Sequence, residues 1–152
     1  MWDMKSILTA FLAVCFCLPL LGDEKSDKEI FESTKARAEK GDAEAQCILG
    51  VMYDYGEGVL EDDKEAVKWY RKAAEQGIVR AQFFLGVMYD YGEGVLEDRV
   101  AAYAWYNIGA ANGGETAKSN KAKLAKTMTP EQIAQAQALS KEMLKKNPKL
   151  LK

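Results

Sequence analysis

The chain has 152 residues, of which 48% are hydrophobic and 29% are charged, a balance that fits one globular domain with its own core. It contains no histidine, which excludes the commonest general base of enzymes and the commonest protein ligand of transition metals. The net charge of -2 conceals an asymmetry, because residues 23–117 carry 11 basic and 20 acidic side chains, whereas residues 118–152 carry 9 lysines and 2 glutamates. The acidic body argues against a nucleic-acid groove, and we expect the basic tail to be a solvated helix face rather than a contact with an anionic envelope surface.

Residues 1–22 are predicted to be a secretory signal peptide. Lys5 is followed by the apolar run ILTAFLAVCFCLPLLG, which has the length of a signal-peptide core. The run is short for a membrane span and contains Pro19, so we expect cleavage, after Gly22, rather than a retained anchor. Neither cysteine of the run follows a small residue, which disfavours a lipoprotein. The protein is therefore expected to be exported, to the periplasm or beyond the cell, with no stable membrane insertion after signal removal.

The rest of the chain is predicted to repeat every 36 residues. The fourteen residues LGVMYDYGEGVLED occur unchanged at 49–62 and at 85–98. Around them, AEKGDAEAQ at 38–46 is echoed by AEQGIVRAQ at 74–82 and by AANGGETAK at 110–118. A repeat of this length built from helical segments indicates an all-α fold, a short α-α superhelix of antiparallel helix pairs.

This period divides the mature chain into four parts: a half repeat that caps the N-terminus (23–37), a first repeat (38–77), a second repeat (78–113), and a degenerate third repeat with a C-terminal capping helix (114–152). Ser26 and Glu29 are expected to form a capping box that opens the half-repeat helix, which should run to about Lys40.

Each full repeat is predicted to be two amphipathic helices. In the first repeat, the two apolar stripes are Ala45, Leu49, Met52 and Tyr53, and then Ala66, Trp69, Tyr70 and Ala73. Gly56 and Gly58 should end the first helix, and Asp62 with Glu65 should begin the second as a capping box, with Gly77 at its end.

Gly50 and Gly86 lie inside predicted helices, where glycine costs about 1 kcal/mol relative to alanine. We therefore expect the partner helix to approach closely at both positions. Trp69 and Trp105, one period apart, are expected to wedge between helices and to contribute a few kcal/mol each through buried apolar area.

The C-terminal part is predicted to close the stack. A helix from Gly114 to about Lys126 should occupy the place of a third first helix, with a sparse core of Ala117, Ala122, Leu124 and Ala125. The last helix should begin at Thr129-Pro130-Glu131-Gln132, a cap with proline in the first turn and glutamine in the box position. Its apolar face is expected to comprise Ile133, Ala136, Leu139 or Ser140, and Met143.

The chain from Ala45 to Gly77 follows the pattern A-x-x-x-L-G-x-M-Y-x-x-G-x-G-V-x-x-D-x-x-x-A-x-x-W-Y-x-x-A-A-x-x-G, which resembles the Sel-one-like repeat (SLR), a relative of the tetratricopeptide repeat. The second copy, from Ala81, has Gly109 where the first has Ala73. The resemblance implies an α-solenoid adaptor that holds other proteins. Bacterial members are often exported and tied to envelope assembly, signalling or host contact.

Six of the fourteen repeated residues have no role in this packing scheme. They are Val51, Asp54, Tyr55, Glu57, Leu60 and Glu61, which recur as Val87, Asp90, Tyr91, Glu93, Leu96 and Glu97. Recent duplication would explain their identity, and so would a shared function. Flanking positions that have diverged, such as Cys47-Ile48 against Phe83-Phe84, weigh against duplication alone.

If the cause is function, the first helices should form a concave wall that binds a partner segment. The expected partner-binding residues are Val51, Asp54, Tyr55, Val87, Asp90 and Tyr91. Tyrosine offers a large contact area at low entropy cost, and the aspartates would select a segment that carries Lys or Arg.

Catalytic and metal sites find little support in the residues. A zinc site would have to combine Cys47, the single cysteine of the mature chain, with carboxylates alone, and we expect Cys47 to be a small hydrophobic residue rather than a cross-link between chains. No serine has lysine at the third position after it, which removes the Ser-x-x-Lys nucleophile pair of β-lactam enzymes. The nearby carboxylates Glu57, Glu61, Asp62 and Asp63 are more simply explained as a solvated loop and a helix cap.

We therefore predict an exported, non-catalytic protein-protein interaction module that binds a protein partner, with no cofactor, no metal ion and no nucleic acid. One alternative is a β-lactam or peptidoglycan-related hydrolase, which only the names given to some cysteine-rich relatives suggest. The other is a self-associating structural protein of the envelope.

Overall fold

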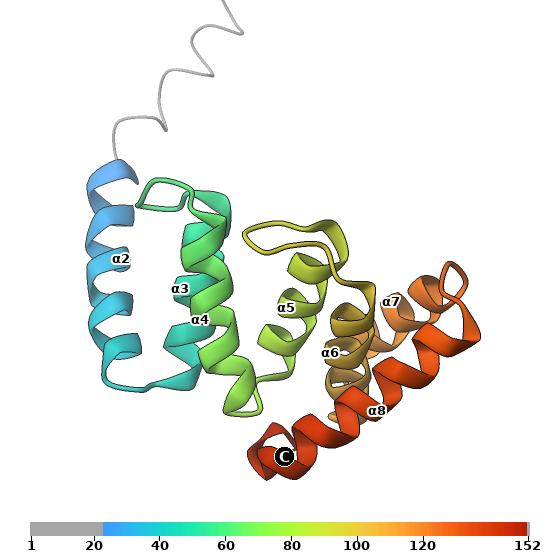
Figure 1. The fold of residues 1–152 in the computed structure, drawn as a ribbon. Helices are drawn as coiled ribbons and strands as arrows, with labels where there is room; N and C mark the ends of the chain where they lie inside the picture. The colour runs from blue at the N-terminus through green and yellow to red at the C-terminus, as the bar shows by residue number, and fades with distance from the viewer. Residues whose placement is uncertain (1–22, 152) are drawn as a thin grey trace, which may run out of the picture.

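The computed structural model describes residues 23–151 as a stack of antiparallel helices without strands, as predicted (Figure 1). The elements are α2 (Asp23–Glu39), α3 (Ala43–Tyr55), α4 (Asp63–Glu75), α5 (Val79–Tyr91), α6 (Arg99–Ala111), α7 (Glu115–Ala125), α8 (Pro130–Lys146) and the 3-10 turn η1 (Pro148–Leu150). The predicted signal peptide lies outside the described residues. Of the helices within 23–151, none has both the length and the apolar character that a membrane crossing requires.

The helices pack in the order in which they follow one another along the chain. The pairs α3/α4 and α5/α6 are the two full repeats, and α2 packs against α3. The helix α7 stands where a third first helix belongs, and the long α8 runs back across α6 and closes the open end of the stack (Figure 1).

The helix α2 serves as the second helix of a preceding repeat. Gly58 lies so close to α2 that a Cβ atom on it would collide with the backbone of Asp27. Gly94 makes the same contact with Asp63 at the start of α4, and Asp27 and Asp63 are one period apart. Both glycines also have positive φ, of 70° and 67°, so close approach and backbone conformation demand glycine together.

The predicted helix starts are partly confirmed. The side chain of Asp62 caps α4 by accepting hydrogen bonds from the backbone N–H groups of Lys64 and Glu65, at 3.0 and 3.1 Å. Glu65 does not complete a capping box, because the Asp62 N–H donates to the Tyr53 carbonyl at 2.9 Å and the Glu65 carboxylate pairs with Lys68. The box at Thr129 and Gln132 forms with both of its hydrogen bonds.

The expected capping box at Ser26 is wrong. Ser26 lies inside α2 (Asp23–Glu39), so its backbone is helical and it does not occupy the non-helical position of an N-cap.

Close contact between the two helices of a repeat accounts for the mid-helix glycines. A Cβ atom on Gly50 would lie 2.5 Å from Cδ1 of Tyr70, and one on Gly86 would lie 2.6 Å from Cδ1 of Tyr106. Both tyrosines are fully buried. Each glycine therefore makes room for an aromatic ring of the second helix, as the sequence predicted.

Most of the predicted core is buried, with one correction at Ala122 and one open alternative decided on α8. Trp69 and Trp105 are buried between helices, and Cys47 is a fully enclosed core residue whose burial raises the pKa of its thiol. Ala122 is exposed, so the core of α7 is even smaller than expected. On α8, Ser140 rather than Leu139 takes the buried place, because its hydroxyl accepts a hydrogen bond from Asn107 at 3.0 Å.

The C-terminal turn makes an attachment that the sequence did not predict. Leu150 is buried in the core, and its carbonyl accepts hydrogen bonds from Gln82 Nε2 at 2.8 Å and Asn112 Nδ2 at 2.6 Å. Asn147 adds a bond to the carbonyl of Glu75 at the end of α4. The C-terminus is thereby fastened to both repeats.

Gly50→Ala should lower the free energy of unfolding by about 1 to 3 kcal/mol, because the added methyl overlaps the ring of Tyr70 and forces the two helices apart. Urea unfolding followed by circular dichroism measures this change, and Gly86→Ala is the matched variant in the second repeat. In a helix without such a neighbour the substitution would stabilise by about 1 kcal/mol, so a gain in stability would contradict the close approach.

Candidate functional site

Asp54 and its copy Asp90 have a structural role that the sequence analysis missed. The hydroxyl of the buried Tyr70 donates to Oδ2 of Asp54 at 2.9 Å, and that of Tyr106 donates to Oδ2 of Asp90 at 3.4 Å. Asp54 thus satisfies a phenol that would otherwise be buried without a partner, whereas Tyr106 also has a side-chain hydrogen bond with Asn120. Their identity in the two repeats follows from this shared packing.

The same arrangement shifts the pKa values of both partners. Burial, together with the adjacent Asp54 carboxylate, raises the pKa of Tyr70 far above its ordinary value. Burial also raises the pKa of Asp54, and the negative charge of Asp63 adds to that rise, although the Tyr70 hydrogen bond opposes it. Asp54 is therefore a partly desolvated carboxylate with a second carboxylate nearby.

Val51 and Val87 are also explained by packing. Both are partly buried, Val51 against the central core cluster and Val87 against the cluster between α6, α7 and α8. Val51 does not line either of the grooves described below, whereas Val87 lines one of them.

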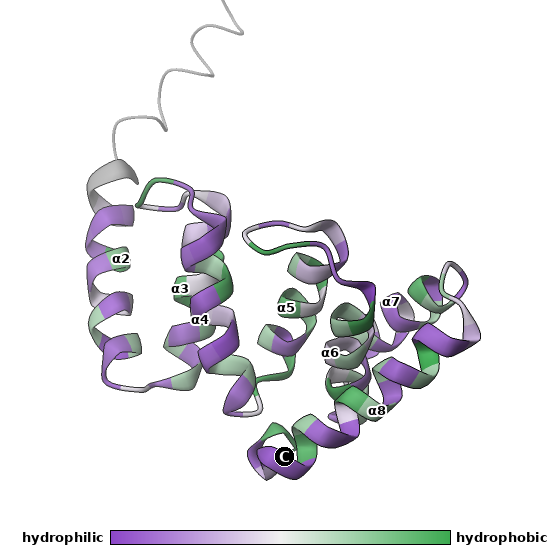
Figure 2. Cartoon of the chain, viewed as in Figure 1, coloured by the Kyte–Doolittle hydropathy of each residue, from purple (hydrophilic) through white to green (hydrophobic). Residues whose placement is uncertain are grey.

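The other four repeated positions without a predicted packing role face solvent in both repeats. Tyr55 and Tyr91 are 65% and 71% exposed, and Leu60 and Leu96 are 88% and 90% exposed. Glu57, Glu61, Glu93 and Glu97 are exposed as well. Figure 2 shows a hydrophobic stretch in each of the two loops that join the helices of a repeat. Packing within the chain does not account for these residues.

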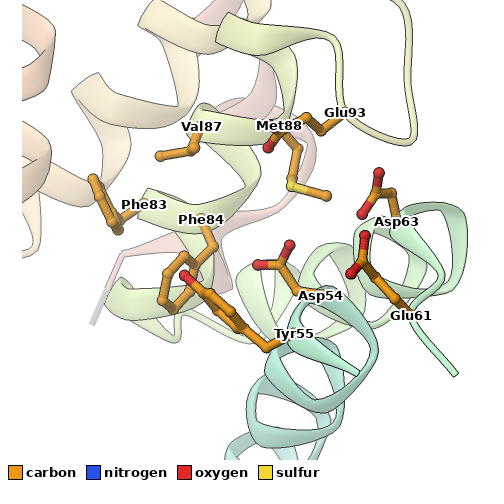
Figure 3. Close-up of a pocket in the computed structure, with 9 residues that line it drawn as sticks. All are labelled: Asp54, Tyr55, Glu61, Asp63, Phe83, Phe84, Val87, Met88 and Glu93. Carbon is orange, nitrogen blue, oxygen red and sulfur yellow. The ribbon is translucent and has the colours of Figure 1, made fainter. Parts of the chain in front are cut away.

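A groove between α3 and α5, the first helices of the two repeats, gathers part of this exposed set. Its cavity volume is about 410 Å³. Its lining comprises Asp54, Tyr55, Glu61, Asp63, Phe83, Phe84, Val87, Met88 and Glu93 (Figure 3). Carboxylates come from both repeats, and beside them the aromatic rings and Met88 form an apolar floor (Figure 3). We call it the first groove.

An equivalent second groove lies one repeat further on, between α5 and α7, with a cavity volume of about 410 Å³. It is lined by Asp90, Tyr91, Glu97, Arg99, Lys123, Leu124 and Thr127. The first three of these residues are the copies of Asp54, Tyr55 and Glu61.

Five of the six predicted partner-binding residues line one of the two grooves. The structure brings Asp54, Tyr55 and Val87 together in the first groove, and Asp90 and Tyr91 in the second. Sequence reasoning missed the residues that the next repeat contributes, which are Phe83, Phe84, Met88 and Glu93 in the first groove and Lys123, Leu124 and Thr127 in the second. The replacement of Cys47-Ile48 by Phe83-Phe84 was a signal for the aromatic floor.

The chemistry of the first groove is that of a binding surface. It presents four carboxylates and no basic side chain, beside exposed tyrosine and half-buried phenylalanine rings. Within residues 23–151, no group of three or more histidine, cysteine or acidic side chains is arranged to hold a metal ion. Such a surface can bind a cationic segment with an apolar portion, since charge selects the segment and the rings provide contact area.

Comparison with known families agrees with this helical architecture. Residues 43–78 and 79–114 each match the family model of the Sel1 repeat, the SLR family of the sequence pattern. Each match begins with the first helix of a pair, α3 or α5. No curated protein matches the chain.

Two similar crystal structures share the fold. One is a protective antigen present in uropathogenic Escherichia coli strains and displaying an SLR fold, with a TM-score of 0.80, 38% identity, and coverage of 86% of this chain and 28% of that one. The other is a Sel1 repeat protein from Oxalobacter formigenes, with a TM-score of 0.60, 35% identity, and coverage of 62% and 39%. The chain therefore spans less than two fifths of either protein.

Asp54→Ala should lower the free energy of unfolding by about 1 to 3 kcal/mol, because it leaves the buried Tyr70 hydroxyl without its acceptor. In a Tyr70→Phe background the same substitution should cost less than about 0.5 kcal/mol, since no hydroxyl is left to satisfy. Urea unfolding of the two single variants and the double variant gives the coupling energy. Equal costs in the two backgrounds would show that the hydrogen bond does not stabilise the repeat.

Proposed function

Since the chain is a Sel1 repeat protein, we propose that it is an exported, non-catalytic adaptor that holds a cationic segment of a partner protein in the first groove. Sel1 repeats typically mediate protein interactions, and their fold is typically non-catalytic. The observation that carries the proposal is the charge of this groove, which presents four carboxylates without a basic side chain between two helical repeats.

The apolar floor supports a peptide rather than a small cation as the ligand. Tyr70 and Phe84 stack with ring centroids 5.0 Å apart, and Phe83 lies beside Phe84 at 5.4 Å. This stacking holds Phe83 and Phe84 in place while part of each ring stays accessible. A rigid aromatic surface binds aliphatic stems of Lys or Arg and neighbouring apolar side chains with little loss of its own entropy.

The exposed tyrosines suit the edges of such a site. Tyr55 projects at the end of α3, where its ring extends the floor formed by Phe83 and Phe84 (Figure 3). A tyrosine that is 65% exposed contributes little to folding, so its identity in both repeats fits a role in contact with another molecule.

The alternatives have less support in the structure. The linings of the two grooves contain no serine, cysteine or histidine, so neither groove holds a Ser-His or Cys-His pair for a hydrolase. Asp62, one of the clustered carboxylates, is used to cap α4. Self-association is the other alternative, and a mass that rises with protein concentration in sedimentation would distinguish it from adaptor function.

Tyr55→Ala/Tyr91→Ala should weaken peptide binding by about tenfold or more, because alanine removes the exposed rings at both grooves. Peptides would be selected from a displayed library of random twelve-residue segments on the immobilised protein, and the affinity of the enriched peptides would be measured by fluorescence anisotropy. We expect the enriched peptides to carry Lys or Arg beside an apolar residue and to bind less tightly as salt is added.

The matched control is Leu60→Ala/Leu96→Ala, which removes another repeated and exposed pair whose members line neither groove. This variant should bind the selected peptides like the unaltered protein, and both double variants should unfold within about 0.5 kcal/mol of it. Loss of binding in the leucine variant with retention in the tyrosine variant would assign recognition to the loops and refute the groove.

Export gives a separate prediction. If residues 1–22 are a cleaved signal, protein recovered from a cell envelope or culture medium should have an intact mass that begins at Asp23. A mass that includes Met1, found in the membrane fraction, would instead establish a retained anchor.

A further inference from the structure

The two grooves have one wall in common and differ in the other. The common wall consists of Asp54, Tyr55 and Glu61 in the first groove and of their copies in the second. Next to this wall, Asp63 at the start of α4 is replaced by Arg99 at the start of α6, one period later, and on the opposite wall Val87 is replaced by Lys123.

This difference changes the local charge balance from strongly acidic to neutral. The first groove has Asp54, Glu61, Asp63 and Glu93 and no basic residue. The second groove has two acidic residues, Asp90 and Glu97, and two basic residues. The same three residues therefore lie among further carboxylates in the first groove and among two basic side chains in the second.

The exposed basic groups of the second groove are available to a ligand. Arg99 Nε donates to Glu97 Oε1 at 3.2 Å, but both side chains are about half exposed, at 47% and 56%. Asp90 is already engaged by the Tyr106 hydroxyl. The side chain of Lys123 makes no hydrogen bond or ion pair with any described residue. An anionic ligand group between Arg99 and Lys123 would thus meet two cations, of which one is unpaired.

The electrostatics of the two aspartates agree with this contrast. Burial raises the pKa of both Asp54 and Asp90. At Asp54 the nearby Asp63 raises the pKa further, whereas at Asp90 the positive charge of Arg99 lowers it. The presence of Arg99 in place of Asp63 at the start of the second helix thus changes the sign of the charge next to the shared aspartate.

We propose that the two grooves are unlike subsites for a single extended segment of mixed charge, in which a Lys or Arg side chain occupies the first groove and an Asp or Glu side chain occupies the second. This inference rests on the proposed function, because it names the chemistry of the segment that the adaptor holds. The observation behind it is charge complementarity along two grooves that flank the same helix, α5.

The geometry also sets the spacing in the segment. The grooves are separated by one helix, and a helix with its side chains is about 10 to 12 Å in diameter. An extended chain rises about 3.3 Å per residue, so the basic and the acidic side chain should be about three or four positions apart in the segment. The order of the two along the segment is open, since an extended segment can lie in either direction.

Two exchanges between the grooves test the inference. Arg99→Asp gives the second groove the residue of the first, and Asp63→Arg gives the first groove the residue of the second. Each places at the first position of a helix a side chain that the other repeat already carries there, so both variants should fold, and circular dichroism with urea unfolding checks this.

The experiment selects peptides from the library of random twelve-residue segments on the unaltered protein and on each variant. The unaltered protein should enrich segments with one basic and one acidic residue three or four positions apart. Arg99→Asp should enrich segments with two basic residues and should bind the original segments about tenfold less tightly. Asp63→Arg should lose the requirement for the basic residue.

The outcomes separate this inference from the adaptor proposal. Enrichment of dibasic segments by the unaltered protein, or an unchanged preference in Arg99→Asp, would overturn the mixed-charge subsites. The adaptor proposal would still stand if binding of those segments depended on Tyr55 and Tyr91. Failure to enrich any segment whose binding depends on these tyrosines would overturn the adaptor and the inference with it.

Discussion

The close packing of Gly50 against Tyr70, repeated by Gly86 against Tyr106, is the contact on which the rest of the structure depends. Because no Cβ intervenes, the aromatic ring of the second helix lies directly on the backbone of the first. This position buries the ring completely and carries its hydroxyl to Asp54 near the end of α3. The second helix is thereby held in a fixed position along the first helix. Its first residue, Asp63, lines the same groove as Asp54. Packing in the core thus determines the charge arrangement at the surface.

The fourteen identical residues therefore have two different causes. Leu49, Gly50 and Met52 are constrained by the core, and Asp54 by the buried phenol that it satisfies. Gly58 is constrained twice, by its φ and by its contact with the preceding helix. Tyr55, Leu60 and Glu61 have no such constraint, since they project into solvent. Duplication without function would let these exposed positions diverge first, as surface substitutions cost little stability, and they have not diverged between the two copies.

The fold could be predicted from the sequence to the extent that it depends on local pattern and period. The 36-residue repeat, the helix pairs, the glycines at the helix ends and the final capping box at Thr129 all follow from residues close together in the chain. The contacts that were not predicted join residues far apart in the chain. Asp54 and Tyr70 are sixteen residues apart and their hydrogen bond is invisible to periodicity, and the carbonyl of Leu150 meets Gln82 across 68 residues. About half of each groove lining comes from the next repeat. The identity between the two repeats therefore indicated the shared residues. The residues on the opposite walls differ between the grooves and were not predicted.

The presence of both shared and variable residues in each groove explains how two nearly identical repeats can present different surfaces. The shared wall requires residues that also hold the helices together, as Asp54 does, so changing it would cost stability. Positions such as 63 and 99 lie at the exposed start of a second helix, where aspartate and arginine are both accommodated by the same fold. A charge reversal there changes the groove without disturbing the Gly-Tyr contact beneath it. Binding specificity in such a solenoid can therefore vary at the first residue of each second helix while the core stays the same.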